Sequence, residues 1–547
     1  MSKRPSSPSL ASDSSNVRTE PDTRSGDAGP AQRARTGEDS TLTRKQDGDE
    51  EMGEFEDTFE DEFEQDDEAE IIYDSDNTDD DDDETMEVDG VKVDGKIKRP
   101  EDEEDEDAPE PATQAYIPGV TPLQDGQTLE ADQSAYEMLH KLNVTWPCLS
   151  FDHLRDHLGN DRQSFPHTSY FVAGTQADVA KNNELMVMKA SSLHKTQGDD
   201  DDSDDEDDDG LDDDAILEYR SIPVLGGINR VRAAPTSTPA SDLEPCLDPY
   251  PVAAWSELGK VHIYDVRPLF NALDRPGTSY DKRKVNTPMF TVEAHRGVEG
   301  YAMDWAGLSG GGSSNGGRAS SLRLLTGDIH SKIFLTTSNN SGFTTMPTPF
   351  TSHTSSVEDL QWSPSEPTVF ASCSADRSIR VWDVRVKSRK SVIAVDEAHE
   401  QDVNVISWNR GTDYLLLSGG DEGGLNVWDL RSFKANTGTK PSPVAAFRWH
   451  TAPISSVEWH PTEDSVFAAS GRDDQVTLWD LSVEEDEEEA GKGEKMKGPD
   501  GKEVPSQLLF CHHGTSDIKE VHWHPQIQGM LTTTALDGFN LFKTISV

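Results

Sequence analysis

The amino-acid sequence predicts an all-β protein, a seven-bladed β-propeller, and three observations support this prediction. Short alternating runs end in Trp-Asp three times, a histidine precedes each of these tryptophans at a constant distance, and turn-forming residues separate the runs. A period of roughly 40 residues with several short strands per unit is typical of propellers. Stacking the units around an axis covers the sheet faces that a single unit leaves exposed.

The first part of the chain is predicted to lie outside the propeller. Residues 1–111 are rich in Ser, Pro, Asp and Glu and poor in apolar residues, so we expect a disordered acidic tail. The folded body is expected to span residues 112–547. Near its start, Tyr136, Leu139 and Leu142 fall at i, i+3 and i+6. With Ser134 as N-cap, this spacing predicts a short amphipathic helix over about 134–143, docked against the body.

The repeat can be measured in three units of the body. In each unit a histidine precedes the closing Trp by 29 residues, and a second Trp follows the histidine by nine. The three sets are His353, Trp362 and Trp382; His399, Trp408 and Trp428; and His450, Trp459 and Trp479. Each unit also has an acidic turn residue, and these are Asp376, Asp421 and Asp473 or its neighbour Asp474. We expect histidine, aspartate and indole N–H to form a structural hydrogen-bond chain, not a catalytic set.

Weaker units complete the ring of seven. His513 precedes Phe542 by 29 residues, and His295 precedes Phe334 by 39, where the Gly/Ser run "GLSGGGSSNGGRAS" accounts for the additional length. "GGINRVRAAP" and "PVAAWSELGKVHIYDVR" predict another blade, and the stretch from "CLSFDHL" to "ILEYRSIPVL" predicts one more. The last unit reaches the C-terminus after three strands. Its fourth strand is therefore expected from the N-terminal side, near "ATQAYIPG".

The charge of the chain predicts basic partners. Lysine and arginine number 49 against 105 aspartates and glutamates, a formal net charge of −56. Like charge opposes direct binding to nucleic-acid phosphates, and it attracts cationic proteins. Two acidic runs fall within the folded region, at residues 198–214 and 483–504, and are expected to be long surface loops between strands.

Other site classes lack a sequence signal. The four cysteines, Cys148, Cys246, Cys373 and Cys511, form no C-x-x-C pair, so neither a zinc cluster nor a disulfide framework is predicted. His522 and His524 flank Trp523 without an evident third metal ligand. No phosphate loop, nucleophile motif, signal core or membrane-length apolar run occurs. We expect a monomeric protein of the cytosol or nucleus that is not an enzyme and uses no cofactor or metal.

Candidate partner-binding residues come from two regions. Five lie where strands are expected to meet the central channel: Glu299, Tyr301, Glu358, Asp402 and Asn404. Five more come from the first acidic loop: Asp200, Asp204, Asp205, Glu206 and Asp207. The alternative interpretations are ordinary exposed turn residues for the first set and a merely solubilising linker for the second.

Several stretches go beyond generic blade residues. "CLSFDHLRDHLG", "FVAGTQA", "SVEDLQWSPSEPTVFASCSADRSIRVWD", "DVNVISWNR" and the ending "FKTISV" resemble the glutamate-rich WD-repeat family. That family includes fungal regulators of ribosome biogenesis and is similar in layout to the retinoblastoma-binding histone chaperones with an N-terminal helix. The resemblance implies a dedicated chaperone without enzymatic activity. Such a chaperone binds a newly made basic protein of the large ribosomal subunit (number three of that subunit), shields it and delivers it to nucleolar pre-60S particles.

Two alternatives remain open at the level of sequence. A histone chaperone is the first, because histones are also basic and the family resemblance includes histone binders. A substrate receptor of a cullin ubiquitin ligase is the second, because Trp-Asp-x-Arg occurs at Trp382–Arg385 and at Trp428–Arg431. The family resemblance implies a nuclear and nucleolar location with a cytoplasmic pool that captures the client.

Overall fold

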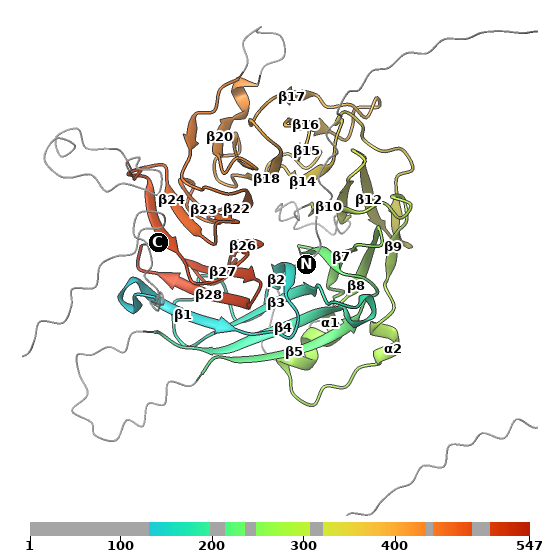
Figure 1. Cartoon of the computed structure of the whole chain (residues 1–547). Helices are drawn as coiled ribbons and strands as arrows, with labels where there is room; N and C mark the ends of the chain where they lie inside the picture. Colours follow the sequence, from blue (N-terminus) through green and yellow to red (C-terminus); the bar gives the residue numbers. More distant parts are fainter. Residues whose placement is uncertain are drawn as a thin grey trace, which may run out of the picture. The chain divides into compact units, whose positions relative to one another are not determined.

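The computed structural model describes residues 131–196, 214–235, 248–306, 321–433, 441–483 and 504–546. These residues form seven four-stranded antiparallel sheets, arranged as blades around a central axis (Figure 1). The structure is a seven-bladed WD-repeat propeller, as the sequence predicts. The two acidic runs fall between β4 and β5 and between β24 and β25, and their acidic residues lie outside the described ranges.

In chain order, the first three blades consist of β2 (Cys148–His153), β3 (His167–Thr175), β4 (Glu184–Leu193) and β5 (Ile216–Pro223); β6 (Ile228–Ala233), β7 (Pro251–Ser256), β8 (Lys260–Asp265) and β9 (Phe290–Val292); and β10 (Gly300–Trp305), β11 (Arg323–Asp328), β12 (Ile333–Asn339) and β13 (Gly342–Thr345). The predicted blades around "GGINRVR" and "CLSFDHL" are both confirmed.

The next three blades consist of β14 (Val357–Trp362), β15 (Val369–Ser374), β16 (Ile379–Asp383) and β17 (Ile393–Val395); β18 (Val403–Trp408), β19 (Leu415–Gly420), β20 (Leu425–Asp429) and β21 (Ala445–Phe447); and β22 (Ile454–Trp459), β23 (Val466–Gly471), β24 (Val476–Asp480) and β25 (Leu508–His512). The seventh blade consists of β26 (Glu520–Trp523), β27 (Met530–Ala535), β28 (Gly538–Thr544) and β1 (Tyr136–Leu142).

Helices are few and lie outside the blades. The α-helices α1 (Arg267–Asp274) and α2 (Lys282–Val285) connect β8 to β9, and α1 buries Leu269, Phe270 and Leu273 in the cluster that contains β4 and β5 side chains. Short 3₁₀ turns are η1 (Gln133–Ala135), η2 (Ala180–Asn182) and η3 (Leu430–Ser432). Among the described residues, no helix is long and apolar enough to span a membrane.

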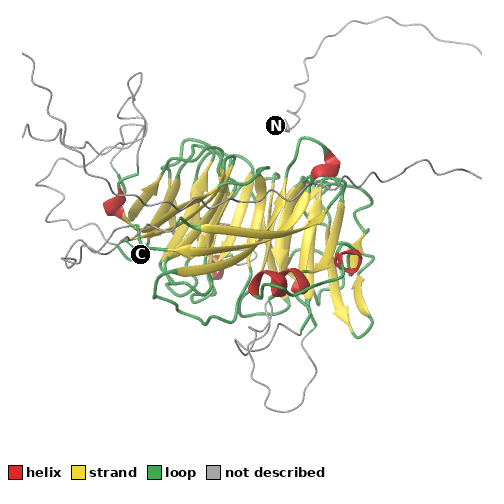
Figure 2. Cartoon of the chain, turned by 90° about the horizontal axis from the view of Figure 1, so that it is seen from below, coloured by secondary structure: helices red, strands yellow, loops and turns green. Residues whose placement is uncertain are grey.

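The strand order gives the ring two distinct rims. In each of the first six blades, the first strand of the chain is the innermost and the fourth the outermost. We call the end where innermost strands begin the upper rim and the end where they finish the lower rim. Turns between second and third strands lie at the upper rim, and α1, which follows a third strand, lies at the lower rim (Figure 2).

The N-terminal part of the ring closes it. β1 pairs antiparallel with β28, in a register from Tyr136 opposite Thr544 to Leu142 opposite Phe539. The prediction that the last blade takes a strand from the N-terminal side is confirmed. Its expected place near "ATQAYIPG" is wrong, because that segment lies outside the described residues and β1 fills the position.

The helix predicted over about 134–143 is also wrong, because β1 occupies these residues after the single turn of η1. Both faces of β1 are buried: Met138 and Leu142 contact one hydrophobic cluster, and Tyr136 and Leu139 contact another. A strand covered on both sides has apolar residues on both faces and loses simple alternation. Its spacing then resembles that of a helix.

The predicted hydrogen-bond chain is present in the Trp-Asp blades. In the fourth blade, the Trp382 indole N–H donates to Ser372 Oγ (2.8 Å), which lies 2.6 Å from His353 Nε2. His353 Nδ1 lies 2.9 Å from the Asp376 carboxylate. Because Trp382 is fully buried, this chain ties the core of the blade to the turn at its upper rim. Serine is the link that sequence reasoning missed.

The same chain recurs in the next two blades. His399 and Trp428 both contact Ser418, and His450 and Trp479 both contact Thr477.

Two members of these chains differ from prediction by one residue. Glu422, not Asp421, lies 2.5 Å from His399 Nδ1. In the seventh blade, the ring that stacks on Phe542 belongs to His512, not His513, at a centroid distance of 4.2 Å. His450 Nδ1 lies 2.9 Å from Asp473, as predicted. Turn and bulge geometry decides these one-residue choices, and spacing alone does not.

We expect the Met138→Ala variant to weaken ring closure. Met138 is fully buried between the first and seventh blades. Truncating a buried methionine removes apolar contacts and leaves a cavity, so the free energy of unfolding should fall by about 2–5 kcal/mol. Chemical denaturation measures this change. The control Lys141→Ala, at an exposed position of the same strand, should change it by less than about 0.5 kcal/mol.

Candidate functional site: the upper rim and the central channel

The upper rim is shaped by a recurring irregularity of the innermost strands. In each of the first six blades, the register of this strand shifts just after its first residue, as in a β-bulge. The residues at the shifts are Leu149, Asn229, Tyr301, Glu358, Asn404 and Ser455. A bulge turns a side chain away from its regular direction, and such positions are common beside binding sites.

The structure places all five predicted rim residues at the upper rim of three neighbouring blades. Tyr301 donates its hydroxyl to Glu299 (3.2 Å), which also accepts from the amide of Asn229 in the second blade (2.8 Å). In the fifth blade, Asn404 donates to Asp421 (2.8 Å), whose backbone N–H donates to the Asp402 carbonyl.

Glu358, in the fourth blade, lies between these two groups in the order of the ring. All five predicted residues are half-buried. The five predicted residues of the acidic loop, Asp200 to Asp207, lie outside the described ranges.

An exposed apolar surface at the upper rim was missed from the sequence. It consists of Val179, Leu225, Leu258, Ile329 and Leu536, in turns of four consecutive blades from the seventh to the third. Leu225 is 62% exposed. Its neighbour Gly226 donates its N–H to the Ala180 carbonyl and approaches Leu258, so the Leu225 loop connects the two adjacent turns. A large leucine at a turn tip was the available signal. We call these five residues the apolar rim.

The other half of the upper rim is acidic. Its carboxylates, in turns and bulges of the fourth to seventh blades, are Glu358, Asp402, Asp421, Glu422, Asp474 and Asp517. Exposed Arg377 and Arg472 lie on the same turns, so the charge is not of one sign. We call these six carboxylates the acidic rim. The upper rim therefore offers apolar contact on one side and negative charge on the other.

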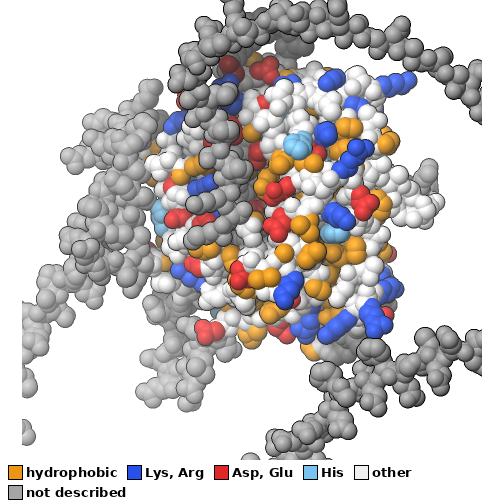
Figure 3. Space-filling model, turned by 45° about the vertical axis from the view of Figure 1, so that its right-hand side comes forward, with side chains coloured by type: hydrophobic (Ala, Val, Ile, Leu, Met, Phe, Trp, Pro, Cys, Tyr) orange, Lys and Arg blue, Asp and Glu red, His pale blue; other side chains and the backbone are white. Residues whose placement is uncertain are grey.

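The folded ring carries little of the chain's negative charge. Figure 3 shows acidic, basic and apolar side chains interspersed on one side of it. Most of the excess of 105 acidic over 49 basic residues falls in residues 1–130, 197–213 and 484–503. Shape and chemistry at the rim and bulk negative charge are thus supplied by different parts of the chain.

The central channel is stitched by hydrogen bonds from blade to blade. Its innermost strands have one edge without a neighbouring strand, and buried backbone N–H groups require acceptors. A side chain of the preceding blade accepts in each case: Asp152 from Ala233 N–H (2.8 Å), Asp304 from Trp362 N–H (2.7 Å) and Glu458 from Trp523 N–H (2.9 Å). Gln361 and Ser407 do the same for Trp408 and Trp459.

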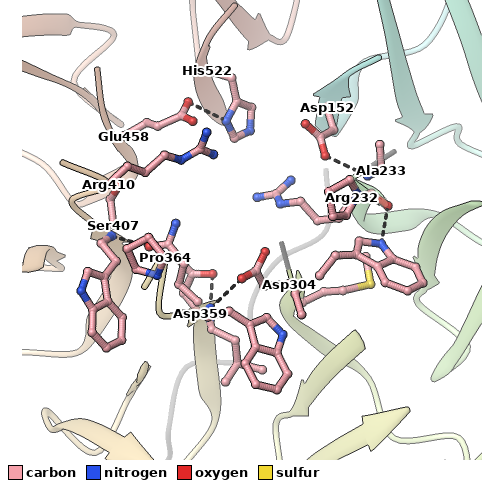
Figure 4. A pocket seen from close by; sticks show the side chains of 18 of the residues that line it. Asp152, Arg232, Ala233, Asp304, Asp359, Pro364, Ser407, Arg410, Glu458 and His522 are labelled. Atoms are coloured by element: carbon pink, nitrogen blue, oxygen red, sulfur yellow. Dashed lines mark hydrogen bonds and ion pairs between the residues drawn. The ribbon is translucent and has the colours of Figure 1, made fainter. Parts of the chain in front are cut away.

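A second tier of such bonds lies nearer the upper rim. Glu520 accepts from Phe151 N–H (3.0 Å), Ser150 from Val231 N–H (2.9 Å) and Asp359 from Ile406 N–H (3.1 Å). Figure 4 shows Asp304, Asp359 and Glu458 around the hollow of the channel. These carboxylates join blades, so their presence at the axis does not by itself indicate a binding site.

Ion pairs neutralise the channel between the seventh, first and second blades. The buried Glu520 carboxylate pairs with Arg230 and with Arg232 (3.2 Å), and lies 3.3 Å from His522 Nε2. His522 Nδ1 lies 3.0 Å from Glu458. Burial opposes protonation of His522, but the two carboxylates outweigh it and raise its pKa to about 9. His522 is therefore a structural cation at neutral pH.

Asp304 has a different environment in the same channel. Burial raises its pKa to about 7, although the Trp362 N–H and Arg232 favour its ionised form.

The Trp-Asp-x-Arg arginines pair with their own motif. Arg385 donates to Asp383 at 2.6 and 3.0 Å, and Arg431 donates to Asp429 at 2.7 and 3.0 Å. Arg431 also lies over the Tyr414 ring, 3.5 Å from its centroid. Both arginines are on the lower rim, and each guanidinium fork is occupied by an aspartate of the same turn.

The described residues contain no group of three His, Cys, Asp or Glu side chains placed to hold a metal ion. The buried thiols Cys148 and Cys373 are free, as is Cys511. Burial raises the pKa of Cys148 to about 12, which leaves its thiol protonated and unreactive at neutral pH.

Comparisons with known proteins agree with this architecture. The chain is 43% identical over 499 residues to ribosome assembly protein rrb1 of Schizosaccharomyces pombe, covering 91% of this chain and 94% of that protein. It is 42% identical over 438 residues to glutamate-rich WD repeat-containing protein 1 of Dictyostelium discoideum, covering 78% and 84%. The chain belongs to the glutamate-rich WD-repeat family.

Other matches place this member of the glutamate-rich WD-repeat family among related propellers. It is 39% identical to Protein HEAT STRESS TOLERANT DWD 1 of Arabidopsis thaliana, covering 84% of this chain and 97% of that protein. The family model "WD domain, G-beta repeat" matches residues 344–383, 390–429 and 441–480. A family model described as histone-binding protein RBBP4 of the CAF1 complex matches residues 126–194, which include β1 to β4.

The pKa of His522 predicts how stability depends on pH. The folded-state pKa of about 9 lies above the ordinary value of 6.5, so this stabilisation is complete below about pH 6.5. It declines as pH rises and is lost above about pH 9. We expect the melting temperature of the wild-type chain to fall over this interval. The His522→Gln variant should show a flatter profile, and an equally steep one would contradict the assignment.

Proposed function

We propose that this protein is a chaperone in ribosome biogenesis that binds a newly made basic protein of the large subunit, number three of that subunit. The observation that carries the proposal is the division of the upper rim into the apolar rim and the acidic rim. A client segment with apolar side chains next to lysines or arginines would contact both halves. The name and high coverage of the S. pombe relative support the ribosomal context.

In this proposal the acidic segments have a different task from the rim. Ribosomal proteins carry dense positive charge meant for RNA, and unassembled copies bind other polyanions. A carrier with a net charge of −56 attracts such a client and screens it until RNA replaces the carrier. The protein would then bind its client in the cytoplasm, act in the nucleus and nucleolus as a monomer, and deliver the client to pre-60S particles without catalysing a reaction.

Histones are the second candidate client. The match of residues 126–194 to a histone-binding family model favours them, and they are similarly basic. Affinity purification of the full chain from growing cells, followed by mass spectrometry, separates the two clients. A translation inhibitor should deplete a newly made ribosomal protein within minutes, whereas a histone client should follow DNA replication.

We expect the double variant Leu225→Asp/Leu258→Asp to lose client. Charges placed on the apolar rim would remove apolar contact and leave a desolvated carboxylate, so retained client should fall at least about tenfold. The amount of co-purified client per tagged chain measures the effect. Leu158→Asp, an equally accessible leucine in the β2–β3 connection of the lower rim, is the matched control. Undiminished retention by the double variant would exclude the apolar rim.

The acidic loop is tested by removing its charge without its length. Replacing the acidic residues of 198–214 by Asn, Gln and Ser leaves the β4–β5 pairing intact, since Ser191 still faces Ile216. We expect a folded chain with slower client capture and a weaker dependence of capture on ionic strength. Stopped-flow or pull-down kinetics at two salt concentrations measure this. Unchanged capture would make the loop a solubilising linker.

A further inference from the structure

The lower part of the central channel is a cavity of about 820 Å³. It is bordered by the second halves of the innermost strands and by the turns that follow them, including Arg155, Arg323 and Arg410. Small-molecule sites in proteins commonly have volumes of roughly 300–1,000 Å³. The proposed client surface is at the opposite rim, so this cavity is not explained by the proposed function.

The carboxylates of the cavity already have donors. Asp152, Asp304 and Glu458 each accept a backbone N–H of the next blade, and Glu458 also pairs with the protonated His522. Their charge is balanced further by Arg232, which lies against Glu520. These acids are therefore engaged in holding the ring and have little need of an added cation.

Three guanidinium groups of the cavity have no such partner. The side chains of Arg155, Arg323 and Arg410 make no hydrogen bond or ion pair with any residue that the structure describes. They come from the first, third and fifth blades, and thus surround the mouth. Figure 4 shows Arg410 and Arg232 pointing into the hollow from opposite sides.

One of these cations is held in place and partly removed from water. The Arg323 guanidinium lies over the Trp362 ring, 4.8 Å from its centroid, and burial lowers its pKa. A cation that loses water without gaining an anion is costly, whereas a bound anion would compensate it. The planar fork of arginine fits phosphate and carboxylate groups with two parallel hydrogen bonds.

We propose that the lower channel is a binding site for a small polyanion with several phosphate or carboxylate groups. Arg155, Arg323 and Arg410 would bind it at the mouth, and Arg232 would face its inner end. A compact ligand fits because the arginines converge from separate blades on one cavity. By bridging three blades, the bound ligand would also stabilise the closed ring.

Calorimetric titration of the full chain tests this site, with inositol hexakisphosphate as the phosphate probe and benzenehexacarboxylate as the carboxylate probe. A salt concentration of about 150 mM limits effects of the distant acidic segments. We expect saturable binding of at least one probe and a melting temperature that rises with its concentration. Which probe binds more tightly identifies the anion class.

The decisive variant is Arg323→Gln/Arg410→Gln, which should weaken binding at least about tenfold. The matched control is Arg385→Gln/Arg431→Gln, which removes two arginines of the same rim that are paired with aspartates and do not border the cavity. The control should bind within about twofold of wild type. If the first double variant does not fold, the single variant Arg410→Gln, at an exposed position, replaces it.

Two results would overturn the proposal. One is the absence of binding of both probes at about 1 mM, which corresponds to no useful affinity. The other is an equal loss of binding in the cavity variant and the control, because this would show only attraction to surface charge. Neither result depends on the ribosomal client, so failure of this site and failure of the proposed function are distinguishable.

Discussion

The backbone ladder between β1 and β28 is the interaction on which the rest of the structure depends. Each blade buries its faces against its two neighbours, so an open ring would expose the faces of the first and last blades. The ladder joins residues about 400 positions apart in the chain, and Met138 and Tyr136 fill the spaces on either side of it. The rims and the channel keep their geometry only while this closure holds.

Closure creates a channel whose innermost strands need hydrogen-bond acceptors, and this need explains most of the charged residues at the axis. Asp152, Asp304 and Glu458 accept backbone N–H groups from the next blade, and Glu520 and His522 connect the seventh blade to the first two. What remains after these bonds are satisfied is informative. The unpartnered arginines of the lower mouth, the apolar rim and the acidic rim are the features that ring stability does not require.

Much of the fold could be predicted because the repeat is local. The spacing of 29 residues between His353 and Trp382, found again in two further units, reflects the length of two strands and their turns. The rim position of Tyr301 and Glu358 also followed from strand order. The acidic loops were found by composition alone. The apolar rim was missed, because a leucine such as Leu225 at a turn tip looks like any exposed residue until neighbouring turns are placed beside it.

The sequence by itself thus determined the number of blades, the buried Trp–His pairs and the excess of negative charge, since these depend on residues near one another or on composition. Only the tertiary structure decided that residues 136–142 form a strand, because their partner β28 lies at the other end of the chain. It likewise chose Glu422 over Asp421, since a turn of one residue more or less changes which carboxylate meets His399. Contacts across blades depend on closure of the whole ring, and local pattern cannot specify them.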